Sequence, residues 1–297
     1  MNMKSSILNI LSALLLAVSL CACSRSVQEY RKGVAVSAAF SDDEDRESLV
    51  SDLHLWFYDA GSGEMILHSA YESAGELALQ IYSIPEGDYT VVLGANISVP
   101  ISFDGENSPS ELNYTLEGVS PVQALSACAD FNVGTLTRVI ELRMDMKRFL
   151  CELAVEVEGS TDGLEIEIEA VNSASSFYPA TKDGNGSYGI PSESVRPTSI
   201  PPFSLSSAAT RSQTFILMPT ALGREWSFWR IVMKTPEGKI LESYIEAPRM
   251  NPGGKYLISL EYAQIQSFMH LSPCTIEDWT QGWVYNGVIT DPTTTNE

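Results

Sequence analysis

The chain has 297 residues with 38 acidic and 18 basic side chains, and its formal net charge at pH 7 is −20. So acidic a surface repels phosphates, and the composition therefore argues against a nucleic-acid-binding protein. A chain of this length is expected to form two domains of about 120–140 residues.

The N-terminus has the pattern of a secretory signal peptide. Lys4 is followed by an almost uninterrupted apolar stretch from Ile7 to Ala22. This stretch is short for a membrane span, which needs roughly 20 apolar residues, so residues 1–22 are expected to be cleaved off. We find no second apolar run long enough to cross a bilayer.

Two cysteines close the apolar stretch, in the sequence VSLCACS. The segment Leu20-Cys21-Ala22-Cys23 resembles the lipobox of bacterial lipoproteins, in which a small residue precedes the cysteine that receives the lipid. Ala22 meets this requirement and Leu20 does not, so Cys23 is the predicted lipidation site. A metal or redox pair is the alternative, but it needs a folded site, which a cleaved peptide cannot provide.

After a polar tether at residues 23–32, alternation with a period of two residues indicates strands. Residues 33–40 place Val34 and Val36 on one face, and residues 53–58 are apolar on both faces. A turn and residues 65–71 complete a hairpin with that strand. Two strands are expected within residues 77–97, joined by a tight turn at 85–88, and further strands at 112–118 and 137–146. A short helix is expected within residues 120–130.

A second block begins at residue 147 with two strands that carry glutamates on one face. Residues 153, 155 and 157 are apolar between glutamates, and residues 164, 166 and 168 repeat the pattern. Facing rows of glutamates would repel each other, so we expect these strands to be offset or separated. More strands are expected at 214–219, 226–247 with a turn at 236–238, 253–263 and 284–289. Residues 180–212 show little periodicity and are expected to form a long connection.

These elements predict an all-β chain of two antiparallel sandwiches. The predicted domains are residues 33–146 and 147–297, behind the signal peptide and the tether. Three cysteines remain in this body, Cys128, Cys151 and Cys274. At most one disulfide can form among them, and buried free thiols are the favoured interpretation.

No catalytic or metal site is predicted. The three histidines, His54, His68 and His270, have no neighbouring ligands at metal-binding spacing, and no nucleophile or phosphate-binding motif occurs. The acidic run 42–45 lacks the spaced ligands of a calcium loop and is interpreted as a solvated loop. The glutamates of residues 152–169 are interpreted as a solvated strand face and not as a glycosidase pair. We therefore expect a protein that is not an enzyme and has no cofactor apart from the lipid on Cys23.

Four tryptophans are candidates for stacking on sugar rings, namely Trp226, Trp229, Trp279 and Trp283. The first two are three residues apart, so on a strand they face opposite ways, one in the core and one exposed or covered by a loop. The alternative is that these rings pack the ends of a sandwich.

The chain resembles the fimbrillin superfamily of Gram-negative anaerobic bacteria, and within it the fimbrial anchor lipoproteins. The resemblance rests on the lipobox, IPEGDYTVVLGAN at 84–96, MDMKRFLCELAVEVEG at 144–159, and NPGGKYLISLEY with IEDWTQGW at 251–283. It implies two transthyretin-like β-sandwiches in tandem. It also implies that a neighbouring subunit is bound by addition of a strand to an open sheet edge.

The implied function is that of an anchor or accessory subunit of fimbriae in cell adhesion, held by its lipid at the outer membrane on the cell surface. The expected partners are the membrane and other fimbrial subunits, with no nucleic acid. Two alternatives remain open. A stalk pilin would be matured by cleavage after Arg46, in the sequence DDEDRES. A surface glycan-binding lipoprotein would use exposed tryptophans to bind carbohydrate.

Overall fold

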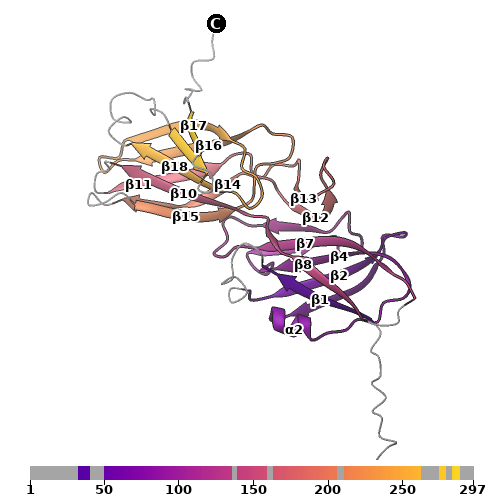
Figure 1. The fold of residues 1–297 in the computed structure, drawn as a ribbon. Coiled ribbons are helices and arrows are strands. Elements are labelled where there is room, and N and C mark those ends of the chain that lie inside the picture. Colours follow the sequence, from indigo (N-terminus) through magenta and orange to yellow (C-terminus); the bar gives the residue numbers. More distant parts are fainter. Residues whose placement is uncertain are drawn as a thin grey trace, which may run out of the picture.

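The computed structural model describes residues 33–40, 50–135, 139–158, 163–205, 211–261, 274–278 and 283–287. The strands and the helix are, in chain order, β1 (Gly33–Ala39), β2 (Leu53–Asp59), β3 (Met65–Tyr71), α2 (Ala74–Ala78), β4 (Gly87–Ala95), β5 (Ile101–Asp104), β6 (Asn113–Leu116), β7 (Leu125–Val133), β8 (Val139–Asp145), β9 (Lys147–Arg148), β10 (Cys151–Glu158), β11 (Leu164–Ala170), β12 (Phe177–Lys182), β13 (Tyr188–Pro191), β14 (Thr198–Leu205), β15 (Arg211–Leu217), β16 (Trp226–Lys234), β17 (Ile240–Pro248), β18 (Lys255–Glu261), β19 (Cys274–Asp278) and β20 (Trp283–Gly287). The strands form two lobes (Figure 1), and the predicted all-β fold is confirmed.

The first lobe is built on a five-stranded sheet in the order β3-β2-β4-β7-β9. Both faces of this sheet are buried, and strand alternation divides the side chains between two cores. Leu55 and Phe57 of β2 enter one core, whereas Trp56 and Tyr58 enter the other. The prediction that residues 53–58 are apolar on both faces is thus confirmed.

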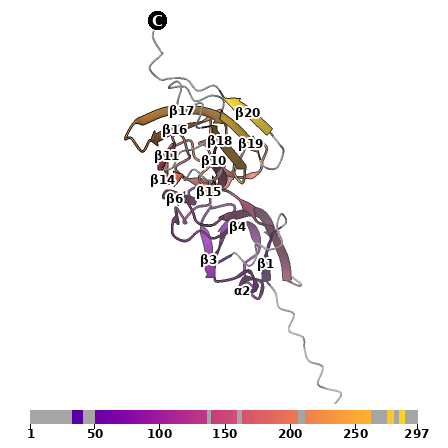
Figure 2. The same cartoon turned by 90° about the vertical axis from the view of Figure 1, so that its left-hand side faces the viewer.

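One face of this sheet is covered by α2 and by a parallel pair of strands, β1 and β8. All seven residues of β1 pair with β8, from Gly33 with Val139 to Ala39 with Asp145. Val34 and Val36 are 0% and 1% exposed, as the alternation in residues 33–40 predicts. β1 and α2 lie at the end of this lobe that points away from the second lobe (Figure 2).

The other face is covered by a four-stranded sheet in the order β13-β12-β6-β5. Its strands come from both sides of residue 147, because Phe177 of β12 pairs with Tyr114 of β6. The ring of Phe177 also stacks on Phe149, with centroids 4.8 Å apart. The β12–β13 hairpin thereby ties the first lobe to the chain of the second, and the boundary at 146/147 stays a prediction.

The second lobe is a sandwich of a five-stranded sheet, β15-β10-β18-β19-β20, and a four-stranded sheet, β14-β11-β16-β17. β10 and β11 lie in different sheets, so their glutamate rows do not face each other, as expected. Between the sheets lies a core that includes Leu153, Ile166 and Trp229. The hairpin of β16 and β17 confirms the predicted turn at 236–238.

Three local predictions are wrong. The short helix expected at 120–130 is absent, because these residues enter β7, which pairs along the whole of β4. The helix lies earlier, at α2, where the Ser73 side chain accepts a hydrogen bond from the backbone N–H of Glu76. The strand expected from residue 77 is therefore largely replaced, and in the described ranges the backbone of this segment pairs with a strand at the isolated bridge between Tyr82 and Val34.

The expected long connection at 180–212 contains the second half of β12, all of β13 and β14, and the start of β15. In the described sheets β13, β14 and β15 are all edge strands. Edge strands tolerate proline and need no strict apolar alternation. These strands therefore form although Pro191 and Pro201 interrupt the pattern that predicts a strand.

Phe177→Ala is expected to lower the free energy of unfolding by about 3 kcal/mol, because it removes a buried ring that packs on Phe149. Denaturant unfolding measures the change. Phe228→Ala is the matched control, since Phe228 is 41% exposed on β16 and should cost less than about 1 kcal/mol. Equal losses for the two variants would contradict the role assigned to Phe177.

Candidate functional site

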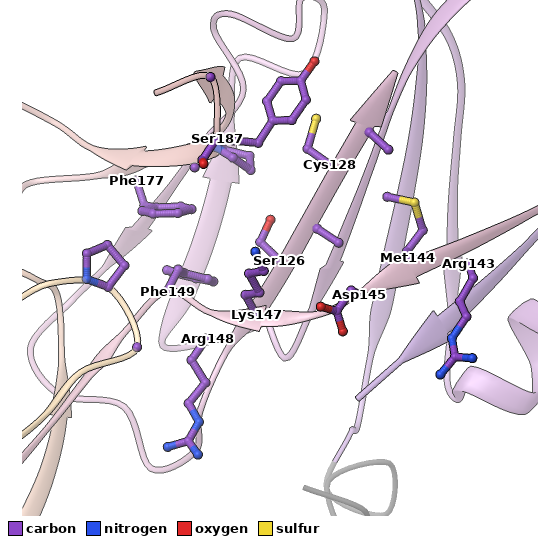
Figure 3. Close-up of a pocket in the computed structure, with 18 of the residues that line it drawn as sticks. Ser126, Cys128, Arg143, Met144, Asp145, Lys147, Arg148, Phe149, Phe177 and Ser187 are labelled. Atoms are coloured by element: carbon purple, nitrogen blue, oxygen red, sulfur yellow. The ribbon is translucent and has the colours of Figure 1, made fainter. Parts of the chain in front are cut away.

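A groove with a volume of about 1090 Å³ lies where the two lobes meet. β7, β8 and β9 of the first lobe line it, together with the β12–β13 hairpin and the turn before β18. Figure 3 shows Ser126 and Cys128 of β7 between Arg143 on one side and Phe177 on the other. The groove therefore combines parts of the chain that are more than 100 residues apart.

The groove contains the edge of β7 that faces away from β4. β9 pairs with this edge only at Leu125 and Ser126. From Ala127 to Val133 no strand of the described ranges pairs with it, and β8 pairs only with β1. Every second residue of an edge strand presents a backbone N–H and C=O that the sheet does not use. At residues 127–129 the groove is thus lined by a strand edge that no described strand covers.

The residues of β7 at the groove are all small: Ser126, Ala127, Cys128 and Ala129. They leave room beside the backbone that larger side chains would fill. Burial raises the pKa of the Cys128 thiol above its ordinary value, so the thiol stays protonated at neutral pH. Cys128 packs, partly buried, against the core that contains Trp56 and Tyr58.

Cations gather around the groove although the chain as a whole is strongly acidic. Arg143 and Lys147 are exposed and make no ion pair with any described residue. Arg148 and Lys255 share the carboxylate of Glu152, at nitrogen–oxygen distances of 3.6 and 3.5 Å. The cations that line the groove outnumber its acidic residue, Asp145, so the groove can hold an anionic group.

The β12–β13 hairpin is held beside β7 through Asp130. Tyr188 and Lys182 of the hairpin donate hydrogen bonds to its carboxylate at 2.5 and 2.9 Å, and Thr90 donates a third at 2.8 Å. Partial burial opposes ionisation of this group, but the three hydrogen bonds outweigh it and lower the pKa of Asp130. The carboxylate therefore fixes one wall of the groove at neutral pH.

A second polar feature lies on the first lobe, where β2 and β3 bring two histidines together. His54 Nδ1 is 3.1 Å from His68 Nε2, and His68 Nδ1 is 3.0 Å from the Glu106 carboxylate. Trp56 donates a hydrogen bond from Nε1 to the same carboxylate at 2.9 Å, and Asp52 lies 3.9 Å from His54 Nε2. Burial lowers the pKa of His54, with Asp52 opposing the shift. The His54 ring therefore resists protonation in the folded protein.

Several predicted site residues lie outside the described residues: Cys23, Arg46 and Trp279, with the acidic run 42–45. Trp283 begins β20 and Cys274 begins β19, and their side chains are not part of the description. Cys128 and Cys151 are free thiols. In the described part of the chain no helix is long and apolar enough to span a membrane.

Two of the predicted stacking tryptophans are placed. Trp229 is 1% exposed in the core of the second lobe, so it cannot stack on a ligand, and its prediction as a stacking residue was wrong. Trp226 is 38% exposed, which confirms that the two rings face opposite ways. Within the described ranges no three His, Cys, Asp or Glu side chains are grouped to hold a metal.

Sequence reasoning missed both the groove and the histidine pair. A signal existed for the groove, since Arg143, Lys147 and Arg148 form a local cluster of cations in an acidic chain. A signal existed for the histidines as well, because the predicted hairpin of 53–58 and 65–71 places them on neighbouring strands. Lys255 and Phe177 reach the groove only through tertiary structure.

The fold defines a two-lobed protein of β-sandwich type, with an edge of β7 between its lobes that the described strands leave uncovered beyond Ser126. Against known families, the sequence profile described as "Fimbrillin-A associated anchor proteins Mfa1 and Mfa2" matches residues 23–286. The chain belongs to this family of fimbrial anchor proteins, which is not a family of enzymes. No curated protein matches the sequence.

Solved structures share the fold at low sequence identity. The fimbrial anchor protein Mfa2 from Porphyromonas gingivalis has a TM-score of 0.54 and 13% identity, over 86% of this chain and 98% of the other. A candidate polysaccharide-binding protein from Bacteroides thetaiotaomicron has a TM-score of 0.57 and 12% identity, with the same coverage. A candidate adhesin from Bacteroides ovatus has a TM-score of 0.52 and 14% identity, over 75% and 86%.

The free energy of unfolding is expected to fall as the pH drops below 6.5, the ordinary pKa of histidine, because the unfolded chain then takes up a proton that folded His54 resists. Above that pH His54 makes no pH-dependent contribution. Urea unfolding at about pH 7.5 and about pH 5.5 measures the loss. Asp52, His68 and Glu106 are the titratable groups that act on the His54 ring. His54→Gln should lose less stability between the two conditions than the parent, and an equal or larger loss would contradict the assignment.

Proposed function

We propose that the protein is an outer-membrane lipoprotein that serves as an anchor or accessory subunit of fimbriae. Membership of the anchor family supports this proposal, and the family match begins at Cys23, the residue that the lipobox marks for lipidation. Each buried methylene of a lipid contributes roughly 0.8 kcal/mol, so two or three acyl chains would make attachment effectively permanent.

The position of β1 carries the proposal. This strand lies between Cys23 and Arg46, it pairs with β8 over its whole length, and Val34 and Val36 are buried in the core of the first lobe. A chain that keeps β1 as its own covalently linked strand keeps its link to the lipid. Cleavage after Arg46 would cut that link, which suits a polymerising stalk subunit and not an anchor.

The anchor would hold a neighbouring subunit by β-strand addition. In this binding mode the backbone hydrogen bonds of an unpaired sheet edge supply affinity, and alternate side chains supply specificity. The edge of β7 that faces away from β4, which no described strand covers from Ala127 to Val133, supports such a role.

The N-terminus and intact mass of the native protein, isolated from membranes, test the proposal most directly. The expected result is a blocked, acylated Cys23 on a chain that still contains Arg46. A free N-terminus at Glu47 would overturn the anchor function and favour a stalk pilin matured by cleavage after Arg46.

Cys23→Ala is expected to release nearly all of the protein from the membrane fraction, because the lipid would be its only attachment. Cell fractionation followed by immunoblotting measures this. Cys21→Ala is the matched control: Leu20 precedes Cys21, so lipidation should continue at Cys23 and the protein should stay with the membrane. Retention of the Cys23 variant would show that another attachment exists.

Surface glycan binding is the second candidate, and two exposed aromatic rings favour it. Trp226 and Phe228 are 38% and 41% exposed on the same face of β16. Exposed rings of this kind can stack on sugars. Calorimetric titration with oligosaccharides tests the candidate: binding that Trp226→Ala abolishes would support it, whereas no binding by the parent would remove it.

A further inference from the structure

We propose that the groove between the lobes accepts an extended acidic segment of a neighbouring fimbrial subunit, which pairs with the exposed edge of β7. This inference rests on the proposed function and deepens it, because it names the edge that is used and the charge of the segment that fills it. Three features carry the inference: an unpaired backbone, small side chains beside it, and cations around it.

The backbone of β7 defines what kind of molecule fits. β4 pairs with β7 from Leu125 to Val133, whereas β9 covers the opposite edge only at Leu125 and Ser126. The uncovered edge presents donors and acceptors that repeat every second residue, about 6.6–6.8 Å apart. A second polypeptide strand has the same repeat, so it can satisfy these groups in register. A sugar chain or a phosphate has no such repeat.

The side chains around this edge leave room for a strand. Those of β7 alternate between the two cores, with Ala127 and Ala129 on one side and Ser126 and Cys128 on the other. None of the four is large. The groove of about 1090 Å³ therefore gives direct access to the backbone, between β8 and the β12–β13 hairpin.

The cations around the groove determine the sign of the charge that its occupant should carry. Arg143 on β8 and Lys147 on β9 are exposed at the groove and make no ion pair with a described residue. Arg148 and Lys255 add two more cations against Glu152, and Asp145 is the acidic residue that lines the groove. The chain as a whole carries a charge of −20, so an acidic segment would be repelled by most of the surface and attracted here.

Strand addition would also join the two halves of the first lobe. β7 belongs to the central sheet, whereas β8 pairs only with β1 on the covering layer. A segment laid along β7 lies beside Arg143 of β8 and Lys147 of β9, so its carboxylates would contact both layers at once.

The test uses the mature full-length chain and two synthetic peptides of about 12 residues, which is long enough to span β7. One peptide alternates Glu with Val and Thr, and the other has Lys in place of every Glu. Fluorescence anisotropy measures binding, and hydrogen exchange shows which backbone amides become protected. We expect the acidic peptide alone to bind, to protect amides within 127–133, and to bind more weakly as salt is added.

Arg143→Glu combined with Lys147→Glu should weaken binding of the acidic peptide at least about tenfold. Arg196→Glu combined with Lys239→Glu is the matched control, since it makes the same change in net charge at exposed residues outside the groove. An equal loss in both double variants would overturn the proposal, as would protection elsewhere than in β7 or no binding at all. Preferential binding of a sulfated oligosaccharide to the same groove would overturn it in favour of a glycan.

The same groove variant separates this inference from the proposed function. If cells with Arg143→Glu and Lys147→Glu keep an acylated protein and normally anchored fimbriae, the groove proposal fails and the anchor function stands. If the parent itself has no acylated Cys23, the anchor function fails whatever the groove binds.

Discussion

The first lobe depends on a single constraint, the burial of both faces of its five-stranded sheet. Leu55 and Trp56 are neighbours in the chain, yet each is fully buried in a different core. A sheet of this kind needs a cover on each side, because either face left open would expose a continuous apolar surface. One cover begins with β1, at the start of the described chain. The other is completed by β12 and β13, which come later in the sequence than β10 and β11 of the second lobe. The lobe cannot be finished until the chain has passed well beyond it.

This constraint explains why the groove exists. The two covers lie on opposite faces of the sheet, and neither reaches around the edge of β7. The chain turns from β8 into β9 and pairs with β7 at only two residues before it continues into the second lobe. The edge is therefore left open at the point where the lobes meet. The cations beside it, Arg143 and Lys147, also fit a known use of charge at strand edges, since charged side chains discourage unspecific pairing between sheets.

Local alternation made much of the fold predictable from sequence. For residues 53–58 and for the glutamate-bearing strands of the second lobe, the residue pattern alone indicates which side chains are buried, because a strand places neighbouring side chains on opposite faces. The strands at 188–205 were not predicted, because Pro191 and Pro201 argue against strand structure in general, although a sheet edge tolerates them. Ser126 to Ala129 were ambiguous because small residues have weak preferences, and pairing with β4 decided their conformation. The groove itself could not be predicted, since Lys255, Phe177 and Arg143 line the same groove only through the tertiary structure of both lobes. The lipidation and cleavage residues, Cys23 and Arg46, stay predictions.

The pairing of β1 has a mechanical consequence. In the proposed arrangement any tension between the membrane and the fimbria enters the protein through the residues that precede Gly33, and so through β1. Ladder hydrogen bonds run across the strands, so a pull along β1 loads the bonds of all seven paired residues together and does not open them one after another. β1 would then act as a shear joint, and its two buried valines would resist withdrawal because each must pass into water as the strand slides.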